Sequence, residues 1–186
     1  TDTQTGEPLG FFYLDLFPRE GKFHHFAMFP IIDGKRLADG NYQRPVISLV
    51  CNFPPPSGDK PSLLDHDSVE TLFHEFGHAM HAILTRAEFT RFAGTSVPGD
   101  FVEAPSQMLE NWTWDKKVFD SFAADYRDPS KKIPPEILGQ LKKAYDLALR
   151  HGHTGARLNK AFQRAFNVAK QVRTETNIQR GSISVA

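Results

Sequence analysis

One segment of the chain, residues 71–85, restricts the possible folds more than any other. It reads TLFHEFGHAMHAILT, and apolar residues recur in and around it every three or four positions. That spacing predicts an amphipathic helix with one face directed toward a core. The same helix carries four polar side chains that a core does not need: His74, Glu75, His78 and His81.

The spacing of these polar residues predicts a metal site. His74 and His78 are four residues apart, so on a helix they differ by about 40° and one turn of rise, and their imidazoles can converge on one ion. Glu75 lies about 100° around the helix from His74, badly placed as a ligand but within reach of a water held by the ion. This HExxH arrangement is typical of zinc sites with a carboxylate as general base. The competing hypothesis is a buried helix with hydrogen-bonded histidines.

A catalytic zinc needs a third protein ligand. Four downstream carboxylates are candidates: Glu88, Asp100, Glu103 and Glu110. Glu88 is too near the end of the same helix to fold back. Asp100 resembles an N-cap, a role that would occupy its oxygens. Glu103 is therefore the best-placed candidate, with Asp100 and Glu110 as the alternatives.

Glu103 begins a polar stripe on a second predicted helix, which runs from about Phe101 to Trp114. The stripe recurs at three- and four-residue steps: Glu103, Ser106, Gln107 and Glu110. Such a stripe usually faces solvent. The alternative is that it faces the metal site, with Glu103 as ligand and either Glu110 or Gln107 holding the ligands in place.

His81 is a weaker candidate ligand. It lies about 20° from His74 on the helical wheel but two turns along, so three histidine ligands would spread over about 10 Å, too far for one ion. His81 also stands where the HExxHxxGxxH pattern of three-histidine sites has glycine, which excludes that pattern. We interpret His81 as a neighbour of the site that reaches solvent, in preference to a residue that contacts substrate.

The rest of the chain predicts a mixed fold. Three segments rich in β-branched and aromatic residues are predicted strands: residues 10–16, 22–29 and 46–53. Asp67 followed by Glu70 has the form of a capping box at the start of the HExxH helix. Two further helices are predicted, one opening at Pro134–Pro135 and one from about residue 154 to residue 172.

Composition fits a globular chain and excludes several kinds of partner. Hydrophobic residues make up 40% and charged residues 24%, and the net charge is zero, which argues against nucleic acid or an acidic membrane as a partner. No segment approaches a membrane span, and the N-terminus shows no signal peptide. The single cysteine, Cys51, rules out an internal disulfide and fits a reducing compartment, so a cytoplasmic location is predicted.

Three stretches resemble the thimet oligopeptidase family of zinc metallopeptidases: LDLFPREGK, PSLLDHDSVETLFHEFGHAMH and GTSVPGDFVEAPSQMLENW. The resemblance covers roughly residues 10–170. It implies one Zn²⁺ held by His74, His78 and Glu103, with Glu75 as the catalytic glutamate. The fold class that follows is α+β and mostly helical, with a small sheet preceding a zincin-type HExxH helix.

The resemblance also indicates what the chain lacks. Family members are several times longer, and this chain does not begin with Met, so we expect a fragment or a processed form. Residues 1–172 are expected to form a partial catalytic core, and residues 173–186 a disordered tail. The family's N-terminal helical lobe and a downstream tyrosine-rich, oxyanion-stabilising segment have no counterpart. His151 and His153 do not match that segment and are interpreted as solvent-facing. Residues 46–53 match an edge strand that lines the family's substrate channel.

The predicted function is zinc-dependent hydrolysis of peptide bonds in short oligopeptides. Glu75 would take a proton from a water activated by zinc and pass it to the leaving nitrogen. One alternative is a zinc-binding fragment of such an enzyme with little or no activity of its own, and another is a different zinc hydrolase built on the same helix. Short peptides are the expected partners, and self-association through exposed apolar surface is a further expectation.

Overall fold

The computed structural model describes residues 1–150 and 183–184, which divide into two compact units. The first comprises Thr1–Pro55 and Ser68–Trp112, and the second comprises Pro56–Asp67 and the chain from Thr113 onward. The predicted helix near residues 154–172, the two histidines at 151 and 153, the predicted domain end and nearly all of the predicted tail lie outside the described residues. Within the described residues, every helix is too short or too polar to cross a membrane.

The first unit is built on a three-stranded sheet in the order β1-β5-β2. β1 (Phe11–Asp15) runs parallel to β5 (Val46–Val50), and β2 (Ala27–Ile32) runs antiparallel to β5 on its other side. The predictions of strands within residues 10–16 and 46–53 are confirmed. The prediction of β5 as an edge strand is wrong, because it is paired on both sides. Parallel pairing joins strands that are far apart in the sequence, and the local pattern of β5 cannot reveal it.

β2 begins later than predicted, at Ala27 rather than near the start of residues 22–29. The cause is Lys22, which is only 7% exposed. Its ammonium also lies 3.0 Å from the carboxylate of Asp15. The ammonium donates to three main-chain oxygens at the ends of β1 and β5, those of Asp15, Phe17 and Cys51. Because these bonds hold Lys22 at the junction of two strands, the segment that contains it turns before it becomes a strand.

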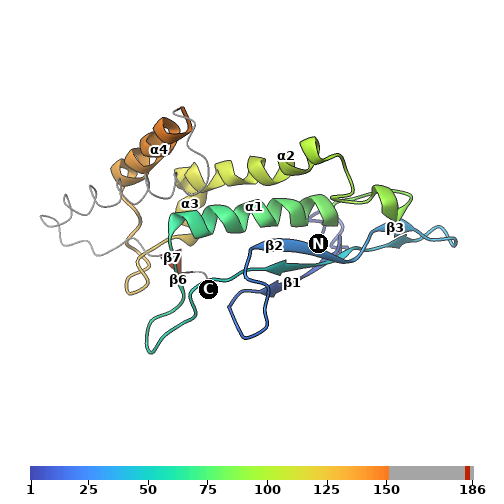
Figure 1. Cartoon of the computed structure of the whole chain (residues 1–186), viewed down its shortest axis with the longest axis horizontal. Helices are drawn as coiled ribbons and strands as arrows, with labels where there is room; N and C mark the ends of the chain where they lie inside the picture. The colour runs from blue at the N-terminus through green and yellow to red at the C-terminus, as the bar shows by residue number, and fades with distance from the viewer. Residues whose placement is uncertain (151–182, 185–186) are drawn as a thin grey trace, which may run out of the picture. The chain divides into compact units, whose positions relative to one another are not determined.

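The HExxH helix is α1 (His66–Ile83), which lies along the sheet in Figure 1 and confirms the prediction from periodicity. It begins one residue before Asp67, so Asp67 lies in the first turn rather than at the predicted cap. The apolar face of α1 packs on the central strand. The buried core that results contains Ile47, Leu49, Ala79, Ala82 and Ile83. The unit is therefore held together between β5 and one face of α1.

A pair of short strands, a 3₁₀ turn and a second helix complete the first unit. β3 (Lys35–Arg36) pairs with β4 (Tyr42–Gln43), and the 3₁₀ turn η1 covers Thr90–Phe92. The predicted second helix is present as α2 (Gly99–Glu110) and continues into the 3₁₀ helix η2 (Asn111–Trp114), whose last two residues belong to the second unit. The prediction that Asp100 caps α2 is wrong. Pro98 precedes the helix, no side chain caps it, and Asp100 lies in its first turn.

The second unit contains α3 (Lys116–Phe122), α4 (Pro135–Arg150) and the pair of short strands β6 (Leu63–Leu64) and β7 (Ile183–Ser184). α4 opens at the predicted proline pair. α3 was not predicted, although Asp115 accepts hydrogen bonds from the first main-chain amides of α3 and so caps it. Helices combined with small sheets agree with the predicted α+β class.

Candidate metal centre

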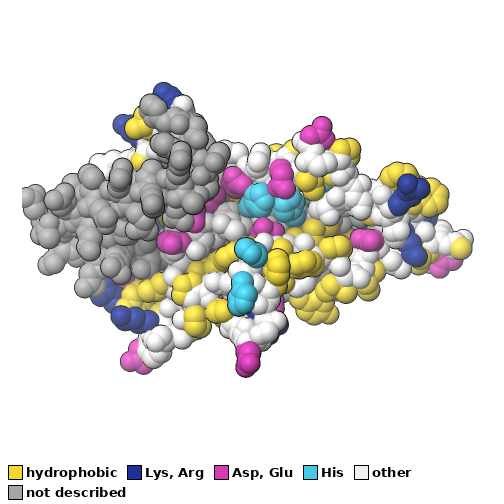
Figure 2. Space-filling model, in the orientation of Figure 1, with side chains coloured by type: hydrophobic (Ala, Val, Ile, Leu, Met, Phe, Trp, Pro, Cys, Tyr) yellow, Lys and Arg dark blue, Asp and Glu magenta, His cyan; other side chains and the backbone are white. Residues whose placement is uncertain are grey.

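Three of the predicted site residues come together in the first unit. His74 and His78 lie one turn apart on α1, and Glu103 lies on α2. The Nε2 atoms of the two histidines are 3.2 Å apart, and Oε2 of Glu103 is 3.2 Å from each of them. Among the residues that the structure describes, this is the cluster of donor side chains suited to a metal ion. On the face drawn in Figure 2, histidine and acidic side chains gather next to one another.

The spacing and chemistry of this cluster fit zinc. Ligand atoms about 2.0–2.1 Å from a tetrahedral ion lie about 3.3 Å from one another. The three donor atoms of His74, His78 and Glu103 form a triangle with sides of 3.2 Å. Two imidazole nitrogens and one carboxylate oxygen are also a donor set of catalytic zinc sites, in which the fourth position stays open. The residues present are therefore suited to zinc.

Glu110 fixes the orientation of His74. Its Oε1 lies 2.6 Å from Nδ1 of His74, so Nδ1 donates this hydrogen bond and Nε2 is left facing the cluster. The hydrogen bond raises the pKa of His74, and burial opposes that effect. The sequence left Glu110 and Gln107 as alternatives for this role. Glu110 makes the contact, whereas Gln107 is exposed on α2.

Gly77 allows α2 to approach α1 closely enough for Glu103 to reach the histidines. A Cβ atom at Gly77 would lie 2.5 Å from Cα of Ser106 and 2.7 Å from the main-chain oxygen of Pro105. Any side chain at this position would push the two helices apart. Sequence reasoning did not single out Gly77, although a glycine between the two histidines on a helix is a signal of close backbone approach.

Glu75, the predicted general base, is not part of the triangle. It is buried, with 8% exposure, and its carboxylate has no hydrogen bond or ion pair with another residue in the described part of the chain. Its charge acts on Cys51, whose thiol pKa is raised to about 11, first by burial and then by Glu75. A carboxylate in this setting is available to accept a proton from a water or a ligand.

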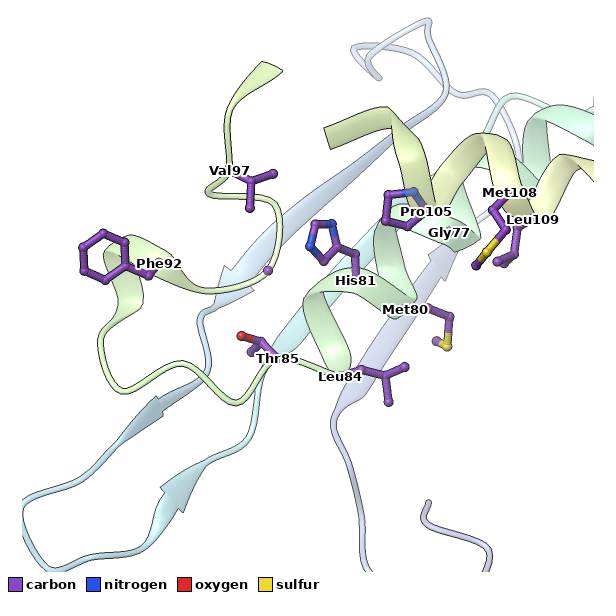
Figure 3. A pocket seen from close by; sticks show the side chains of 11 residues that line it. Gly77, Met80, His81, Leu84, Thr85, Phe92, Val97, Pro105, Met108 and Leu109 are labelled. Carbon is purple, nitrogen blue, oxygen red and sulfur yellow. The ribbon is translucent and has the colours of Figure 1, made fainter. Parts of the chain in front are cut away.

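The other candidate residues lie away from the triangle. Glu88 forms a 2.9 Å ion pair with Arg36, and Asp100 is exposed. His81 is partly buried, and its interpretation as a solvent-reaching neighbour of the site stays a prediction. Its ring lines an apolar pocket of about 510 Å³, with the ring of Phe101 at 6.2 Å, and burial lowers the pKa of His81 (Figure 3).

Residues 1–162 match the family model of peptidase family M3. The chain belongs to this family. M3 relatives include a thimet-like oligopeptidase of Dictyostelium discoideum, which is 49% identical over 140 residues. Oligopeptidase A of Escherichia coli is 43% identical over 149 residues, and a mitochondrial intermediate peptidase of Arabidopsis thaliana is 40% identical over 139 residues.

These matches cover most of this chain and a small part of each M3 relative. They span 75%, 78% and 75% of the chain, but only 21%, 22% and 20% of the respective relatives. The chain thus spans about a fifth of the length of the curated relatives it matches. All three relatives have names that describe peptidases. One is named for the mitochondrion, so the relatives' names do not point to a single compartment.

Proposed function

We propose that this chain supplies the zinc centre and general base of a metallopeptidase that hydrolyses peptide bonds in short oligopeptides. His74, His78 and Glu103 would hold one Zn²⁺. The observation that carries the proposal is the triangle of donor atoms with sides of 3.2 Å, in a chain of a peptidase family. Bound zinc would act as a Lewis acid and lower the pKa of a water to about 7, so that hydroxide is supplied near neutral pH.

The chain's own residues would handle the proton and the geometry. Glu75 would accept the proton of the attacking water and deliver it to the leaving nitrogen, which turns an amine anion into a neutral amine. Glu110 would keep His74 in the tautomer whose Nε2 has a free lone pair, because Nδ1 carries the hydrogen of the 2.6 Å bond. The burial of Glu75 supports its role, since few waters compete there for its carboxylate.

Several finer points belong to the same proposal. We propose that α1 and the sheet are arranged as in zincins, that the protein is cytoplasmic and that it prefers short peptides. These points are supported by the family membership and by the residue pattern. Self-association through apolar surface is supported by β1, where Phe11, Tyr13 and Leu14 are all exposed.

A second candidate is a zinc-binding piece with little turnover of its own. This candidate is favoured because the chain covers only about a fifth of the length of its relatives. Positioning of a peptide and stabilisation of the tetrahedral intermediate both contribute to hydrolysis. The triangle of His74, His78 and Glu103 performs neither task by itself. In that case zinc would bind without measurable cleavage.

Zinc stoichiometry, measured together with cleavage of a quenched-fluorescent oligopeptide, tests the proposal. The chain should bind one zinc, and Glu103→Ala should bind it much more weakly. Glu75→Gln should keep the metal and lose hydrolysis, because the amide is nearly isosteric but does not accept the proton. If the chain itself does not turn over, this comparison is made in a longer version with activity to lose. A Glu75→Gln variant that cleaves as fast as its parent would exclude Glu75 as the base.

A further inference from the structure

Ser106 has a role that the zinc centre described above leaves unassigned. It lies on α2 and is completely buried, with 0% exposure. Its hydroxyl is 2.9 Å from Oε2 of Glu103 and 2.9 Å from the main-chain oxygen of the same residue. Oε2 is also the atom that lies 3.2 Å from both imidazole nitrogens. One carboxylate oxygen thus carries the contacts to both histidines and to Ser106.

The hydroxyl has a single hydrogen, so it can donate to only one of these two oxygens at a time. A hydrogen bond to an ionised carboxylate is stronger than one to a neutral carbonyl, so the hydrogen is expected on the Oε2 side. The contact matters because the Glu103 side chain is otherwise only half-buried and has several rotamers available. A bond from a buried, immobile donor keeps Oε2 directed toward the histidines.

We propose that Ser106 is a positioning residue for the metal centre, which selects Oε2 of Glu103 as the ligand oxygen and holds it in place before the ion arrives. This inference rests on the proposed zinc site. Ser106 acts through Glu103 and touches neither metal nor substrate. The predicted consequence is a lower zinc affinity when the hydroxyl is removed, by about tenfold or more, as expected when a group that orients a ligand is lost.

Ser106 also has a packing role that must be separated from this one. Ser106 is completely buried where α2 comes closest to Gly77, its Cα 2.5 Å from the place of a Cβ atom on Gly77, so the position requires a small residue. Ser106→Ala keeps the Cβ atom and removes only the hydroxyl, so the helix contact is preserved. Ser121 on α3 offers a matched control. Its hydroxyl donates to the main-chain oxygen of Val118, three residues earlier, and has no carboxylate partner.

The test is a double-mutant cycle on the full 186-residue chain. The dissociation constant for Zn²⁺ is measured by competition with a chelator for the unchanged chain, Ser106→Ala, Glu103→Ala, the double variant and Ser121→Ala. The visible spectrum of bound Co²⁺ reports on the ligand geometry of each. Thermal unfolding of the metal-free proteins reports separately on packing. Alanine has a higher helix propensity than serine, so Ser106→Ala is expected to leave α2 folded.

The expected result is a loss of about tenfold or more in zinc affinity for Ser106→Ala, no further loss when the same change is made in Glu103→Ala, and no change for Ser121→Ala. A Ser106→Ala variant with unchanged affinity and Co²⁺ spectrum would overturn the inference and leave the zinc site intact. Equal losses with and without Glu103 would overturn it as well, because Ser106 would then act through packing. An unchanged chain that binds no zinc would instead overturn the proposed function together with this inference.

Discussion

The two faces of α1 are held in place by different kinds of contact. One face packs on β5 through Ile47, Leu49 and Ala79, none of which has any exposed surface. The other face meets α2 through directed contacts of partly exposed side chains, the two histidines with Glu103. Apolar packing depends on area and volume, whereas the donor triangle depends on individual atoms. One helix thus separates what stabilises the fold from what would bind an ion.

The strongest test of this separation is Leu49→Ala. Leu49 is fully buried, and truncation of such a residue costs about 2–5 kcal/mol of unfolding free energy. Denaturant unfolding of the metal-free chain measures this loss. Zinc affinity, measured where the variant is still folded, should be almost unchanged. A tenfold fall in affinity under those conditions would mean that the two faces are coupled.

His78→Ala should show the opposite pattern. Structural zinc sites with four ligands bind with about 10–16 kcal/mol, so the loss of one ligand is expected to cost about 3 kcal/mol, or roughly 100-fold in affinity. Unfolding of the metal-free chain should change far less, because His78 is only partly buried. Chelator competition and unfolding are measured on the same preparation. Unchanged affinity would remove His78 from the ligand set.

Gly77→Ala should lower both the stability and the zinc affinity, because Gly77 belongs to the helix contact that brings Glu103 to the histidines. A Cβ atom 2.5 Å from Cα of Ser106 forces α1 and α2 apart, which costs about 1–3 kcal/mol of stability and also weakens zinc binding. Gly139 on α4 is the control, since a Cβ atom there meets nothing within 4 Å. Gly139→Ala should stabilise the chain by up to about 1 kcal/mol, through helix propensity alone. If both variants behave alike, the close approach is not the cause.

A pH experiment tests His66, whose pKa is shifted in the opposite direction to that of His74. His74 has its pKa raised by Glu110, whereas burial lowers the pKa of His66, whose ring lies 4.2 Å from that of Trp114. The unfolded chain therefore binds a proton at His66 more readily than the folded chain does. The stability contributed by a neutral His66 is complete above the ordinary pKa of about 6.5 and falls below it, by at most about 1.4 kcal/mol per pH unit.

His66→Gln should accordingly reduce the acid loss of stability. The measurement is denaturant unfolding with a chelator present at pH 7.5 and at pH 5.5, for the unchanged chain and the variant. An identical loss in both proteins would show that the burial of His66 has no energetic effect on its titration.

Most of the candidate site could be predicted because it follows helical geometry. The four-residue spacing of His74 and His78 and the polar stripe that begins at Glu103 are both local patterns, and the structure brings these three side chains together. The polar stripe alone could not decide whether Glu110 or Gln107 orients His74. It depends on how α2 is rotated about its axis, which is set by the contact at Gly77.

Two failures of sequence reasoning share a cause, which is contact with residues outside the local segment. The late start of β2 follows from Lys22, whose partners belong to two other parts of the chain. The central place of β5 follows from its parallel pairing with β1. α3 is a different case, because Asp115 gave a local capping signal in front of a short helix that was too brief to show periodicity.

The bonds of Lys22 give the protein a built-in chemical reporter. Its amine is shielded and occupied by oxygens at the ends of β1 and β5, so a reagent that labels amines reaches it only when that strand junction opens. The labelling rate of Lys22, followed by mass spectrometry, therefore measures how often this junction opens without unfolding of the whole chain. A change in that rate on addition of zinc would show that zinc binding alters how often the strand junction opens.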